Sequence, residues 1–397
     1  MTSPPTRFRT VKVSLLTGCN DKHYQLSLLS GLLSHGMRVD FIGNDDMIDA
    51  AAYEGVSYFN LRGEQDPQAP LWRKALRIMR YYMGLIGYAA SCDTKVFHIQ
   101  WLNRFEYFDR TLLNVYYKAL GKKIVFTAHN VNARKRDGND GLLNRMTLRF
   151  MYKIVDHIIV HTEKMSEELV KEFGVGRGKI TVIPHGIHDS VPCTGLTPVE
   201  ARERLGLERK ERVILFFGNI RRYKGLEYVV RALPRLKRVG CTVRLLVAGR
   251  IGDPDCWERI ESIVDREHLE DSIIRATGYV PDEDVEVYFK ASDLMVLPYT
   301  HVFQSGVLFL AYNFGLPVVV ADVGSLREEV VVGETGFVCK PADPEDLAGK
   351  IALYFNSELY RNLGKVRPRI IQYAREKYSW RKIGKMTVDV YRKVMED

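Results

Sequence analysis

Cysteine is scarce in this sequence, and no two cysteines are closely spaced. The 397 residues contain six of them and no C-x-x-C pair: Cys19, Cys92, Cys193, Cys241, Cys256 and Cys339. Zinc knuckles and small disulfide-stapled domains both depend on closely spaced cysteines. The sequence therefore argues against both, and we expect a protein of the reducing cytoplasm that binds no metal.

Long apolar runs are also missing. No run reaches the roughly 18 residues of a membrane-spanning helix, and the short run after Thr10 predicts a first strand rather than a secretory signal. No G-x-G-x-x-G motif follows a predicted strand, so a dinucleotide-dependent oxidoreductase would lack its fingerprint. We expect a protein that does not cross a membrane.

What the chain does have is an ordinary globular composition with unevenly placed positive charge. Hydrophobic residues make up 46% and charged residues 27% of a chain long enough for two domains. The net charge is +9, and residues 71–153 alone carry 16 lysines and arginines against 5 acidic residues. Nucleic acid, an anionic membrane surface and a phosphorylated substrate are candidate partners. Nucleic acid is the weakest candidate, because no recognised binding module accompanies the charge.

Short β-branched segments alternate with amphipathic ones, which predicts an α/β fold of doubly wound domains with parallel sheets. The predicted strands are 11–16, 39–43, 95–99, 124–127, 157–161, 180–183, 213–217, 243–248, 273–276, 294–297, 317–321 and 336–338. Residues 184–201, rich in Pro, Gly and Thr, predict a linker. We expect Rossmann-like domains at 1–190 and 191–375, and a C-terminal helix, 376–397, that packs back on the first domain.

The loop FFGNIRRYKG, residues 216–225, has the pattern of an anion site. A predicted strand leads to Gly218, where a missing side chain lets a ligand approach the backbone. Arg221, Arg222 and Lys224 then supply cations within one turn. The alternative is a solvated basic loop that precedes a helix.

A second anion site is predicted at the start of QSGVLFLAYNFGLPVVVADVG, residues 304–324. Unpaired N–H groups and the dipole of a helix start favour a phosphate there. Ser305 could instead serve only as a helix cap, and Glu328, which opens the next helix, could pair with that helix's dipole or grip a hydroxylated group. Two anion sites at the carboxyl edge of one parallel sheet predict a diphosphate, with a nucleotide sugar as the natural candidate.

These segments resemble the donor-binding domain of the retaining glycosyltransferases of family 4. The resemblance rests on FFGNIRRYKG, LLVAGR, GYVPDEDVEVYFKASDLMVLPY, QSGVLFLAYNFGLPVVVADVGSLREEV and GETGFVCKPADPEDLA, in this order within residues 212–348. It is looser in the first half, where it rests on residues 16–20, FTAHN, HIIVHTEKMSEELVKEFG and KITVIPHGI. It implies the GT-B architecture of two facing Rossmann-like domains, a nucleotide-diphosphate sugar as co-substrate, retention of anomeric configuration, and neither metal nor other cofactor.

The resemblance also implies roles for single residues. Arg222 and Lys224 would neutralise the diphosphate together with the amides of residues 305–307, and His129 would face the donor sugar. The turn at Tyr279 and Val280 would contact the base, and Glu328 the ribose. The implied catalytic residues are His129, Lys224 and Arg222, and the implied donor-binding residues are Gly18, Gly218, Lys224, Val280, Gln304, Ser305, Gly306, Val307 and Glu328.

The sequence departs from the family pattern at three places. Val302 and Leu310 stand where two glutamates are usual, and Asn219 follows the strand-ending glycine where arginine is common. The glycine pair of the first loop is reduced to Gly18 followed by Cys19. These changes put the identity of the donor in question more than the reaction class.

Residues 71–90, LWRKALRIMRYYMGLIGYAA, place a basic stripe on a predicted helix rich in apolar side chains; the stripe is Arg73, Lys74, Arg77 and Arg80. This helix is either a core helix with a solvated basic face or a surface helix that rests on anionic lipid. A second cluster, Arg134, Lys135 and Arg136, follows His129 and would suit a phosphate-bearing acceptor.

Other candidate residues favour structural roles. Asp253 and Asp255 have the spacing of a metal-binding pair, but they lie in a turn before a predicted helix, where Asp acts as a cap. We expect the remaining candidates to be satisfied core or edge histidines, because they lie in or beside predicted buried strands: His98, His157 and His161.

These observations predict a retaining, metal-independent glycosyltransferase. Its acceptor would be a glycan or a lipid-linked glycan used in cell-surface polysaccharide or glycolipid synthesis, at the inner face of the membrane. Two alternatives stay open. One is a non-catalytic nucleotide-sugar-binding subunit, suggested by the apolar Val302 and Leu310. The other is a sugar-nucleotide epimerase or phosphorylase of the same architecture.

Overall fold

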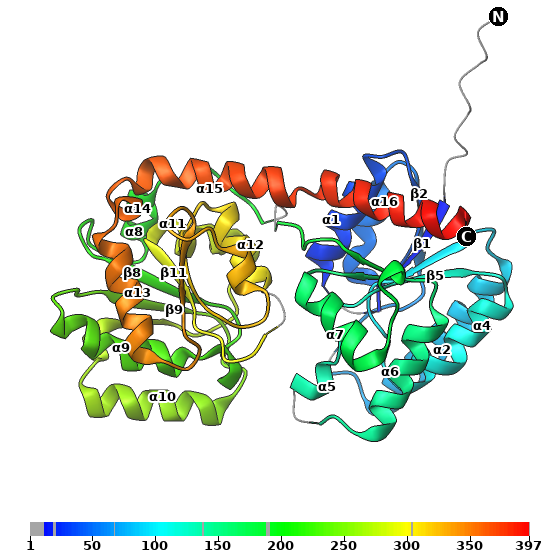
Figure 1. Ribbon diagram of the computed structural model, residues 1–397, viewed down its shortest axis with the longest axis horizontal. Coiled ribbons are helices and arrows are strands. Elements are labelled where there is room, and N and C mark those ends of the chain that lie inside the picture. Colours follow the sequence, from blue (N-terminus) through cyan, green and yellow to red (C-terminus); the bar gives the residue numbers. More distant parts are fainter. Residues whose placement is uncertain are drawn as a thin grey trace, which may run out of the picture. The chain divides into compact units, whose positions relative to one another are not determined.

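The computed structural model describes residues 12–18, 21–66, 68–136, 139–187, 191–302 and 305–396, without the side chains of Lys135 and Arg136. Contacts group the chain into two compact units: Met1–Gly186 with Trp380–Asp397, and Ile187–Ser379 (Figure 1). The packing places the divisions after residues 186 and 379 rather than after 190 and 375. The reason is that Ile187 and Tyr378 are both buried in the core of the second unit.

The first unit is built on a parallel sheet of short, buried strands. In the described residues these are β1 (Lys12–Leu16), β2 (Arg38–Gly43), β3 (Val56–Asn60), β4 (Val96–Ile99), β5 (Lys123–Thr127), β6 (His157–Val160) and β7 (Ile180–Val182), in the order β3-β2-β1-β4-β5-β6-β7. β4 and β6 are buried at every position, so the sheet must be covered on both faces. Because the strands are parallel, the loops that follow β1, β4, β5 and β6 meet at one edge of the sheet.

The helices of the first unit cover this sheet, and the C-terminal helix is one of them. They are α1 (Lys22–Leu33), η1 (Asp45–Ala52), α2 (Leu71–Ser91), α3 (Glu106–Phe108), η2 (Asp109–Leu113), α4 (Asn114–Ala119), α5 (Ala133–Arg136), α6 (Leu142–Ile154), α7 (Glu163–Phe173), η3 (Arg177–Lys179) and α16 (Trp380–Glu396). α16 lies against α1 (Figure 1). A Cβ on Gly31 would lie 2.3 Å from the carbonyl oxygen of Trp380, and one on Gly384 would lie 2.3 Å from that of Gly31. These two glycines therefore allow the close approach of the helices.

The second unit repeats the plan with a second parallel sheet. Its described strands are β8 (Val213–Phe217), β9 (Arg244–Ala248), β10 (Ile273–Ala276), β11 (Leu294–Leu297), β12 (Val318–Ala321) and β13 (Gly336–Cys339), in the order β10-β9-β8-β11-β12-β13. Its helices are α8 (Pro198–Arg204), η4 (Arg222–Lys224), α9 (Leu226–Arg238), α10 (Pro254–Glu267), η5 (Glu270–Ser272), α11 (Asp282–Ala291), α12 (Gly306–Asn313), η6 (Leu326–Glu329), α13 (Pro344–Asn356), α14 (Glu358–Arg361) and α15 (Leu363–Tyr378). The loops that follow β8 and β11 lie next to each other, because these strands are neighbours.

Two elements differ from the sequence-based expectation. β3 was missed: it is an edge strand whose residues are half-buried or exposed, so it lacks a clear apolar pattern. The expected linker, 184–201, ends in α8, which Thr197 and Glu200 begin with a reciprocal capping box. Across the described ranges, every helix is too short or too polar to span a bilayer.

Candidate functional site

In the second unit, the chain turns sharply at Gly218, directly after β8. The φ angle of Gly218 is 102°, in a region that residues with a side chain rarely adopt. A Cβ at this position would lie 2.9 Å from the Nζ of Lys224. The missing side chain therefore leaves room for the Lys224 ammonium group at the carboxyl edge of the sheet.

Backbone contacts hold Lys224 in this place. A Cβ on Gly225, whose φ is 72°, would lie 2.1 Å from the carbonyl oxygen of Pro298. The N–H of Thr300 donates to the carbonyl of Tyr223 at 2.8 Å. Both contacts fasten η4 to the segment that follows β11, so the backbone positions the lysine.

The side chain of Lys224 is buried, and its ammonium group has no counter-charge among the described residues. The residue is 9% exposed, and burial lowers the pKa of its side chain. No described residue accepts a hydrogen bond from Nζ or forms an ion pair with it, and the nearest aromatic group is the ring of Tyr299, whose centre is 5.7 Å away. A buried charge without a partner is strongly unfavourable. The surroundings of Lys224 therefore favour an anion beside its ammonium group.

The start of α12 lies beside Gly218 and Lys224. A Cβ on Gly218 would lie 3.7 Å from Cγ2 of Val307, in the first turn of this helix. Ser305 is 6% exposed and precedes the helix, but its side chain makes no capping hydrogen bond; its Oγ lies 3.3 Å from the hydroxyl of Tyr299. A helix cap is therefore not the role of the Ser305 side chain in this structure, and no described side chain caps the first N–H groups of α12.

The other predicted donor residues of this unit differ in exposure. Arg222 is exposed at the first position of η4, and Gln304 lies outside the described residues. Val280 packs partly against the core of the unit. Its neighbour Tyr279 is 70% exposed, with the guanidinium of Arg250 at 5.8 Å from the centre of its ring.

The two glutamates of η6 have different environments. Glu328 is exposed. Glu329 is buried, accepts a hydrogen bond from the hydroxyl of Tyr378, and lies 3.7 Å from the Nζ of Lys377. Burial is the largest cause of its raised pKa. Glu329 thus ties the end of α15 to η6, whereas Glu328 is exposed on the surface.

In the first unit, Gly18 and His129 both lie against Trp101. Gly18 follows β1 with a φ of 56°, and a Cβ there would lie 1.9 Å from the carbonyl oxygen of Trp101. The ring of His129 stacks on the indole of Trp101, with 3.9 Å between centroids and 5° between planes. The loops after β1, β4 and β5 therefore form one cluster at the carboxyl edge of the first sheet.

A short relay of hydrogen bonds fixes the protons on His129. Nδ1 of His161 lies 2.9 Å from the carbonyl oxygen of Ile183, which can only accept, so this nitrogen donates. Nε2 of a neutral His161 is then an acceptor, and Nδ1 of His129, 3.0 Å away, donates to it. The remaining lone pair is on Nε2 of His129, which is buried and has no hydrogen-bond partner among the described residues.

The histidines of this cluster are held neutral by burial. Burial lowers the pKa of His161 to about 4 and that of His185 to about 4, and it lowers the pKa of His129 well below the ordinary value. Tyr24 of α1 packs against all three rings at centroid distances of 4.8–5.9 Å. At neutral pH, Nε2 of His129 is therefore a hydrogen-bond acceptor that aromatic packing holds in place.

Two family models match the chain, one in each unit. The model described as Glycosyltransferase Family 4 matches residues 23–191, and the model described as Glycosyl transferases group 1 matches residues 211–356. Together the two matches cover most of the chain. This protein belongs to the group 1 glycosyltransferases.

Relatives of this protein are 26–27% identical to it over the residues that align. An uncharacterized glycosyltransferase of Methanocaldococcus jannaschii is 26% identical over 246 residues, which is 60% of each chain. A glycogen synthase of Mycobacterium tuberculosis is 27% identical over 278 residues, 68% of this chain and 62% of that one. The chain thus matches about 60% of the length of these relatives.

Solved structures show the same fold. The Anabaena protein HepE, in complex with UDP-glucose, superposes with a TM-score of 0.72 at 15% identity. The superposition covers 96% of this chain and 99% of the HepE chain. The chain therefore has the α/β two-domain GT-B fold that the sequence predicts.

The residues that depart from the family pattern are buried or partly buried in the second unit. Leu310 is 7% exposed on the buried side of α12, and Val302 packs partly against the same core. Neither side chain offers a polar contact to a sugar. The carbonyl oxygen of the Asn219 side chain, where the family often has arginine, is buried without a hydrogen-bond partner among the described residues.

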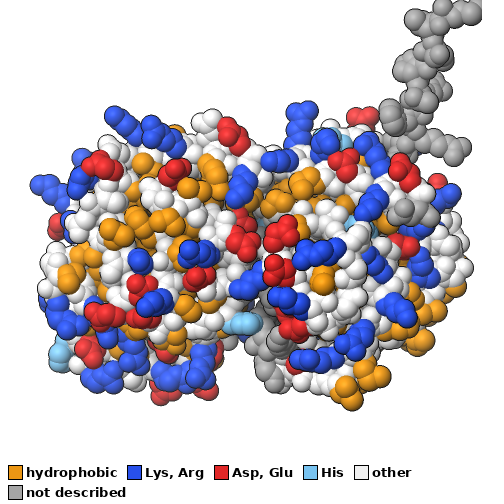
Figure 2. All heavy atoms as spheres, viewed as in Figure 1, with side chains coloured by type: hydrophobic (Ala, Val, Ile, Leu, Met, Phe, Trp, Pro, Cys, Tyr) orange, Lys and Arg blue, Asp and Glu red, His pale blue; other side chains and the backbone are white. Residues whose placement is uncertain are grey.

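The basic stripe of α2 lies on a helix that is only partly buried. Tyr81, Tyr82, Leu85, Tyr88 and Ala89 face the core, but Trp72 is 64% and Met79 52% exposed. Figure 2 shows hydrophobic side chains along the lower edge of this unit, over α2 and α6 of Figure 1. The helix is thus neither a plain core helix nor an isolated surface helix: it combines a buried face, a basic stripe and exposed apolar side chains.

The second basic cluster is partly engaged in local contacts. Arg134 donates to the hydroxyl of Tyr107 at 2.7 Å, and its guanidinium lies 4.9 Å from the centre of that ring. It also lies 3.6 Å from Glu106. The side chains of Lys135 and Arg136 are outside the description. Arg134 therefore fastens α5 to α3, and the role of the cluster in acceptor binding stays a prediction.

Most of the residues to which the sequence analysis assigned structural roles have such roles in the structure. Asp253 caps α10 by accepting from the N–H of Cys256, as expected, and the described residues contain no group of three or more His, Cys, Asp or Glu side chains that could hold a metal. His98 and His157 are satisfied core histidines, bonded to Tyr391 and Thr181 among others.

Sequence reasoning missed most of the first-unit cluster: His161, Trp101, His185 and Tyr24. His161 was expected only to fill the core, and Trp101 was not considered. A signal existed for His161. β5 and β6 pair in parallel with Thr127 opposite Ile159, and His129 and His161 each follow their strand residue by two positions. The two histidines are therefore neighbours at the carboxyl edge of the sheet.

Proposed function

We propose that this protein moves a sugar from a nucleotide-diphosphate donor to an acceptor. One observation carries the proposal: Lys224 is a buried lysine without a counter-charge among the described residues, and it lies beside Gly218, which also adjoins the start of α12. A diphosphate would neutralise the lysine and accept from the uncapped N–H groups of residues 305–307. The exposed Tyr279 under Arg250 offers a flat surface for the base. HepE, which has the same fold, is described in complex with UDP-glucose.

In this proposal the reaction proceeds with retention and without metal or other cofactor. No described side chain stands out as a nucleophile, so catalysis rests on positioning and on stabilising the departing diphosphate. Lys224 and α12 would supply that stabilisation, with the exposed Arg222 as an additional cation. Nε2 of His129 would accept a hydrogen bond from a hydroxyl of the transferred sugar. The acceptor would be a glycan or a lipid-linked glycan in cell-surface polysaccharide or glycolipid synthesis, at the inner face of the membrane.

The donor site is tested by titration calorimetry against a panel of nucleoside diphosphates and their sugars. Lys224→Ala removes a charge-assisted contact worth about 1.5–3 kcal/mol, so the affinity for the best nucleotide should fall roughly tenfold or more. Lys237→Ala is the matched control, because Lys237 is an exposed lysine of the same unit. The control should bind the nucleotide like the parent. The site assignment would be wrong if Lys224→Ala also remained folded and bound the nucleotide like the parent.

A second candidate function is a non-catalytic subunit that binds a nucleotide sugar, and the apolar Val302 and Leu310 favour it. Donor hydrolysis or transfer by the purified protein separates the two, because a binding subunit would release no nucleoside diphosphate. An epimerase would instead return a changed nucleotide sugar. Where transfer occurs, the anomeric configuration of the product, read by proton NMR, tests retention.

A further inference from the structure

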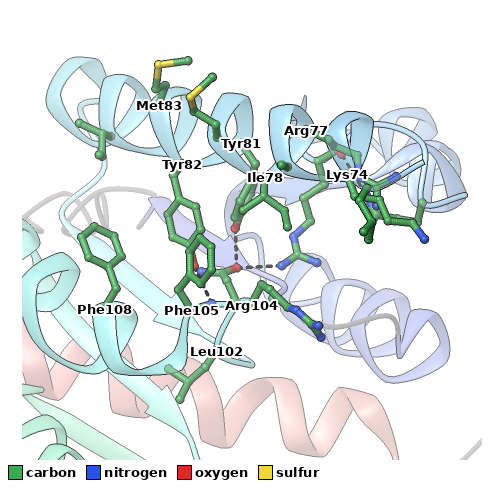
Figure 3. Close-up of a pocket in the computed structure, with 18 residues that line it drawn as sticks. Lys74, Arg77, Ile78, Tyr81, Tyr82, Met83, Leu102, Arg104, Phe105 and Phe108 are labelled. Carbon is green, nitrogen blue, oxygen red and sulfur yellow. Dashed lines mark hydrogen bonds between the residues drawn. The ribbon is translucent and has the colours of Figure 1, made fainter. Parts of the chain in front are cut away.

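A groove runs along α2 in the first unit (Figure 3). Its volume is about 1180 Å³, and its walls are one side of α2 and residues 102–108. Gly18 also lines it. Because Gly18 follows β1, the groove reaches the carboxyl edge of the sheet, where Gly18 lies against Trp101 and His129 stacks on that indole.

The walls of this groove are largely apolar and partly open to solvent. In Figure 3, Ile78, Tyr81 and Tyr82 point from α2 toward residues 102–108. The ring of Phe105 stacks on Tyr82 at a centroid distance of 5.6 Å, and Phe105 is still 56% exposed. The rim is formed by further apolar side chains that stay accessible: Met79, Met83 and Ile86. Exposed apolar surface beside a cavity marks a binding site, and methionine adapts to flexible ligands.

The charges that line the groove are all positive. They belong to Arg62, Lys74, Arg77 and Arg104, and no Asp or Glu is among the described lining residues. Arg62 donates to the amide oxygen of Asn103 at 2.8 Å, and Arg77 to the backbone carbonyl of Glu64 at 2.6 Å, so neither of these bonds cancels the positive charge. The Nε of Arg62 is buried without a partner among the described residues.

The groove has a basic end and an apolar end. Figure 3 shows Lys74, Arg77 and Arg104 gathered at one end, and Met83 and Phe108 toward the other. α2 follows β3, so the first turns of α2 start from the carboxyl edge of the parallel sheet. The basic end therefore lies at the edge that carries Gly18, and the apolar end extends away from it. Lys74 and Ile86 are twelve residues apart, which corresponds to roughly 18 Å of helix.

We propose that this groove binds the acceptor, and that the acceptor is an amphiphile with a phosphate group on a hydrocarbon chain. The phosphate lies among Arg62, Arg77 and Arg104, and the chain runs between Ile78 and Phe105 toward Met83. The inference rests on the proposed function and adds the chemical class of the acceptor. A free glycan does not match the groove, because a sugar needs several polar partners and most of the wall offers none. A phosphate-bearing lipid matches both ends.

The test uses the full-length protein and decyl phosphate below its aggregation concentration, measured by titration calorimetry. Decanol and inorganic phosphate report the two halves of the ligand separately. Phe105→Ser opens the apolar wall, and its control is Phe150→Ser, since Phe150 is an exposed phenylalanine of α6 that does not line the groove. Arg104→Gln removes a cation from the basic end, and its control is Arg73→Gln, an exposed arginine of α2 that does not line the groove.

We expect decyl phosphate to bind at least tenfold more tightly than decanol or inorganic phosphate. Phe105→Ser and Arg104→Gln should each weaken this binding roughly tenfold, since each removes part of one end. The control variants should bind like the parent. Equal losses in Phe105→Ser and Phe150→Ser would overturn the inference in favour of a non-specific apolar surface. If inorganic phosphate bound as tightly as decyl phosphate, the groove would be an anion site only, and the inference would be overturned.

Two further readouts keep the outcomes distinct. Each variant is also titrated with the nucleotide that binds best at the second unit, and it should bind it like the parent. If the parent itself bound no nucleotide, the proposed donor site would be contradicted. The result with decyl phosphate would not be affected. Self-association of the parent that Phe105→Ser abolishes, without decyl phosphate binding, would identify a second copy of the chain as the occupant and overturn the inference.

Discussion

Nδ1 of His129 lies 3.0 Å from Nε2 of His161, on loops that follow the neighbouring strands β5 and β6. His161 is held in turn by the carbonyl of Ile183, so it determines which nitrogen of His129 carries the proton. Because β5 and β6 are buried and in register, the two rings have little freedom to reorient. His161 is thus a positioning residue for a side chain that the resemblance places at the donor sugar.

Replacing His161 by phenylalanine keeps the ring packing and removes the acceptor for Nδ1 of His129. An unsatisfied buried donor costs on the order of 1–3 kcal/mol, so we expect kcat to fall roughly tenfold or more. KM for the donor should stay unchanged, because the phosphate-binding residues are in the other unit. His161→Asn, whose amide oxygen can accept, should recover part of the loss. Steady-state kinetics of the three proteins would contradict the relay if His161→Phe had the kcat of the parent.

The buried histidines also predict how stability depends on pH. Burial lowers the pKa of His98 to about 3 and those of His161 and His185 to about 4, below the value of about 6.5 in an unfolded chain. Between these values the unfolded chain binds more protons than the folded one, so the free energy of unfolding falls as pH falls from about 6.5 to about 4. Stability is fully present above about pH 6.5.

This prediction is checked by urea unfolding at about pH 7.5 and about pH 5. The urea concentration at the unfolding midpoint should be lower at about pH 5. His98→Gln removes one of the buried titrating groups and should reduce the difference between the two midpoints. His268→Asn is the control, because His268 is exposed and its left-handed backbone tolerates Asn. An equal effect of both variants would show that the buried histidine is not responsible.

Lys224 leads to a prediction in which stability and binding move in opposite directions. Its charge has no ion-pair partner among the described residues, so Lys224→Met should raise the thermal midpoint of the free protein by a few degrees. The same change should remove the stabilisation that nucleoside diphosphate gives the parent. Arg222→Met, at an exposed position of the same turn, should leave the midpoint nearly unchanged. A lower midpoint in Lys224→Met would mean that the ammonium group is satisfied.

Most of the fold could be predicted from the sequence, because its strands are short β-branched runs that are buried in parallel sheets. β3 could not, since an edge strand that is half-exposed on both faces has no pattern that distinguishes it from a loop. The end of the linker could have been predicted: Thr197, Pro198 and Glu200 form a recognisable helix start.

The site could be predicted only as a set of loops. The sequence indicates a glycine followed by cations after β8, but it does not say which cation is buried. Tertiary contacts decide this: Gly225 against Pro298 and Thr300 on Tyr223 turn Lys224 inward and leave Arg222 exposed. The groove along α2 likewise depends on residues 102–108, which no sequence period connects to α2.

The absence of a metal requirement is a separate prediction. Lys224 and the N–H groups at the start of α12 are placed to neutralise a diphosphate, so transfer should continue at an unchanged rate in excess chelator. The measurement is nucleoside diphosphate release with and without EDTA, followed by addition of magnesium or manganese. A loss of activity that either metal restores would contradict the prediction and direct attention back to Asp253 and Asp255.

The stripe of Arg73, Lys74, Arg77 and Arg80 predicts binding to an anionic membrane. Each cation near such a surface contributes about 1 kcal/mol, and the effect decays within a Debye length. Replacing all four by glutamine should therefore abolish sedimentation with phosphatidylserine-containing vesicles at low salt and leave nucleotide binding intact. The control is the same replacement of four exposed cations on α16, namely Arg381, Lys382, Lys385 and Arg392. This control changes the net charge equally.

Trp72 and Met79 test the apolar part of the same prediction. At 64% and 52% exposure they contribute little to the core, so replacing both by serine should hardly change the free energy of unfolding. On a membrane face the same double replacement should weaken vesicle binding, because it removes the apolar side chains next to the basic stripe. Vesicle binding equal to that of the parent in the four-glutamine variant would contradict membrane association. The basic residues would then serve a phosphate-bearing acceptor alone, and Arg77→Gln should weaken decyl phosphate binding where Arg73→Gln does not.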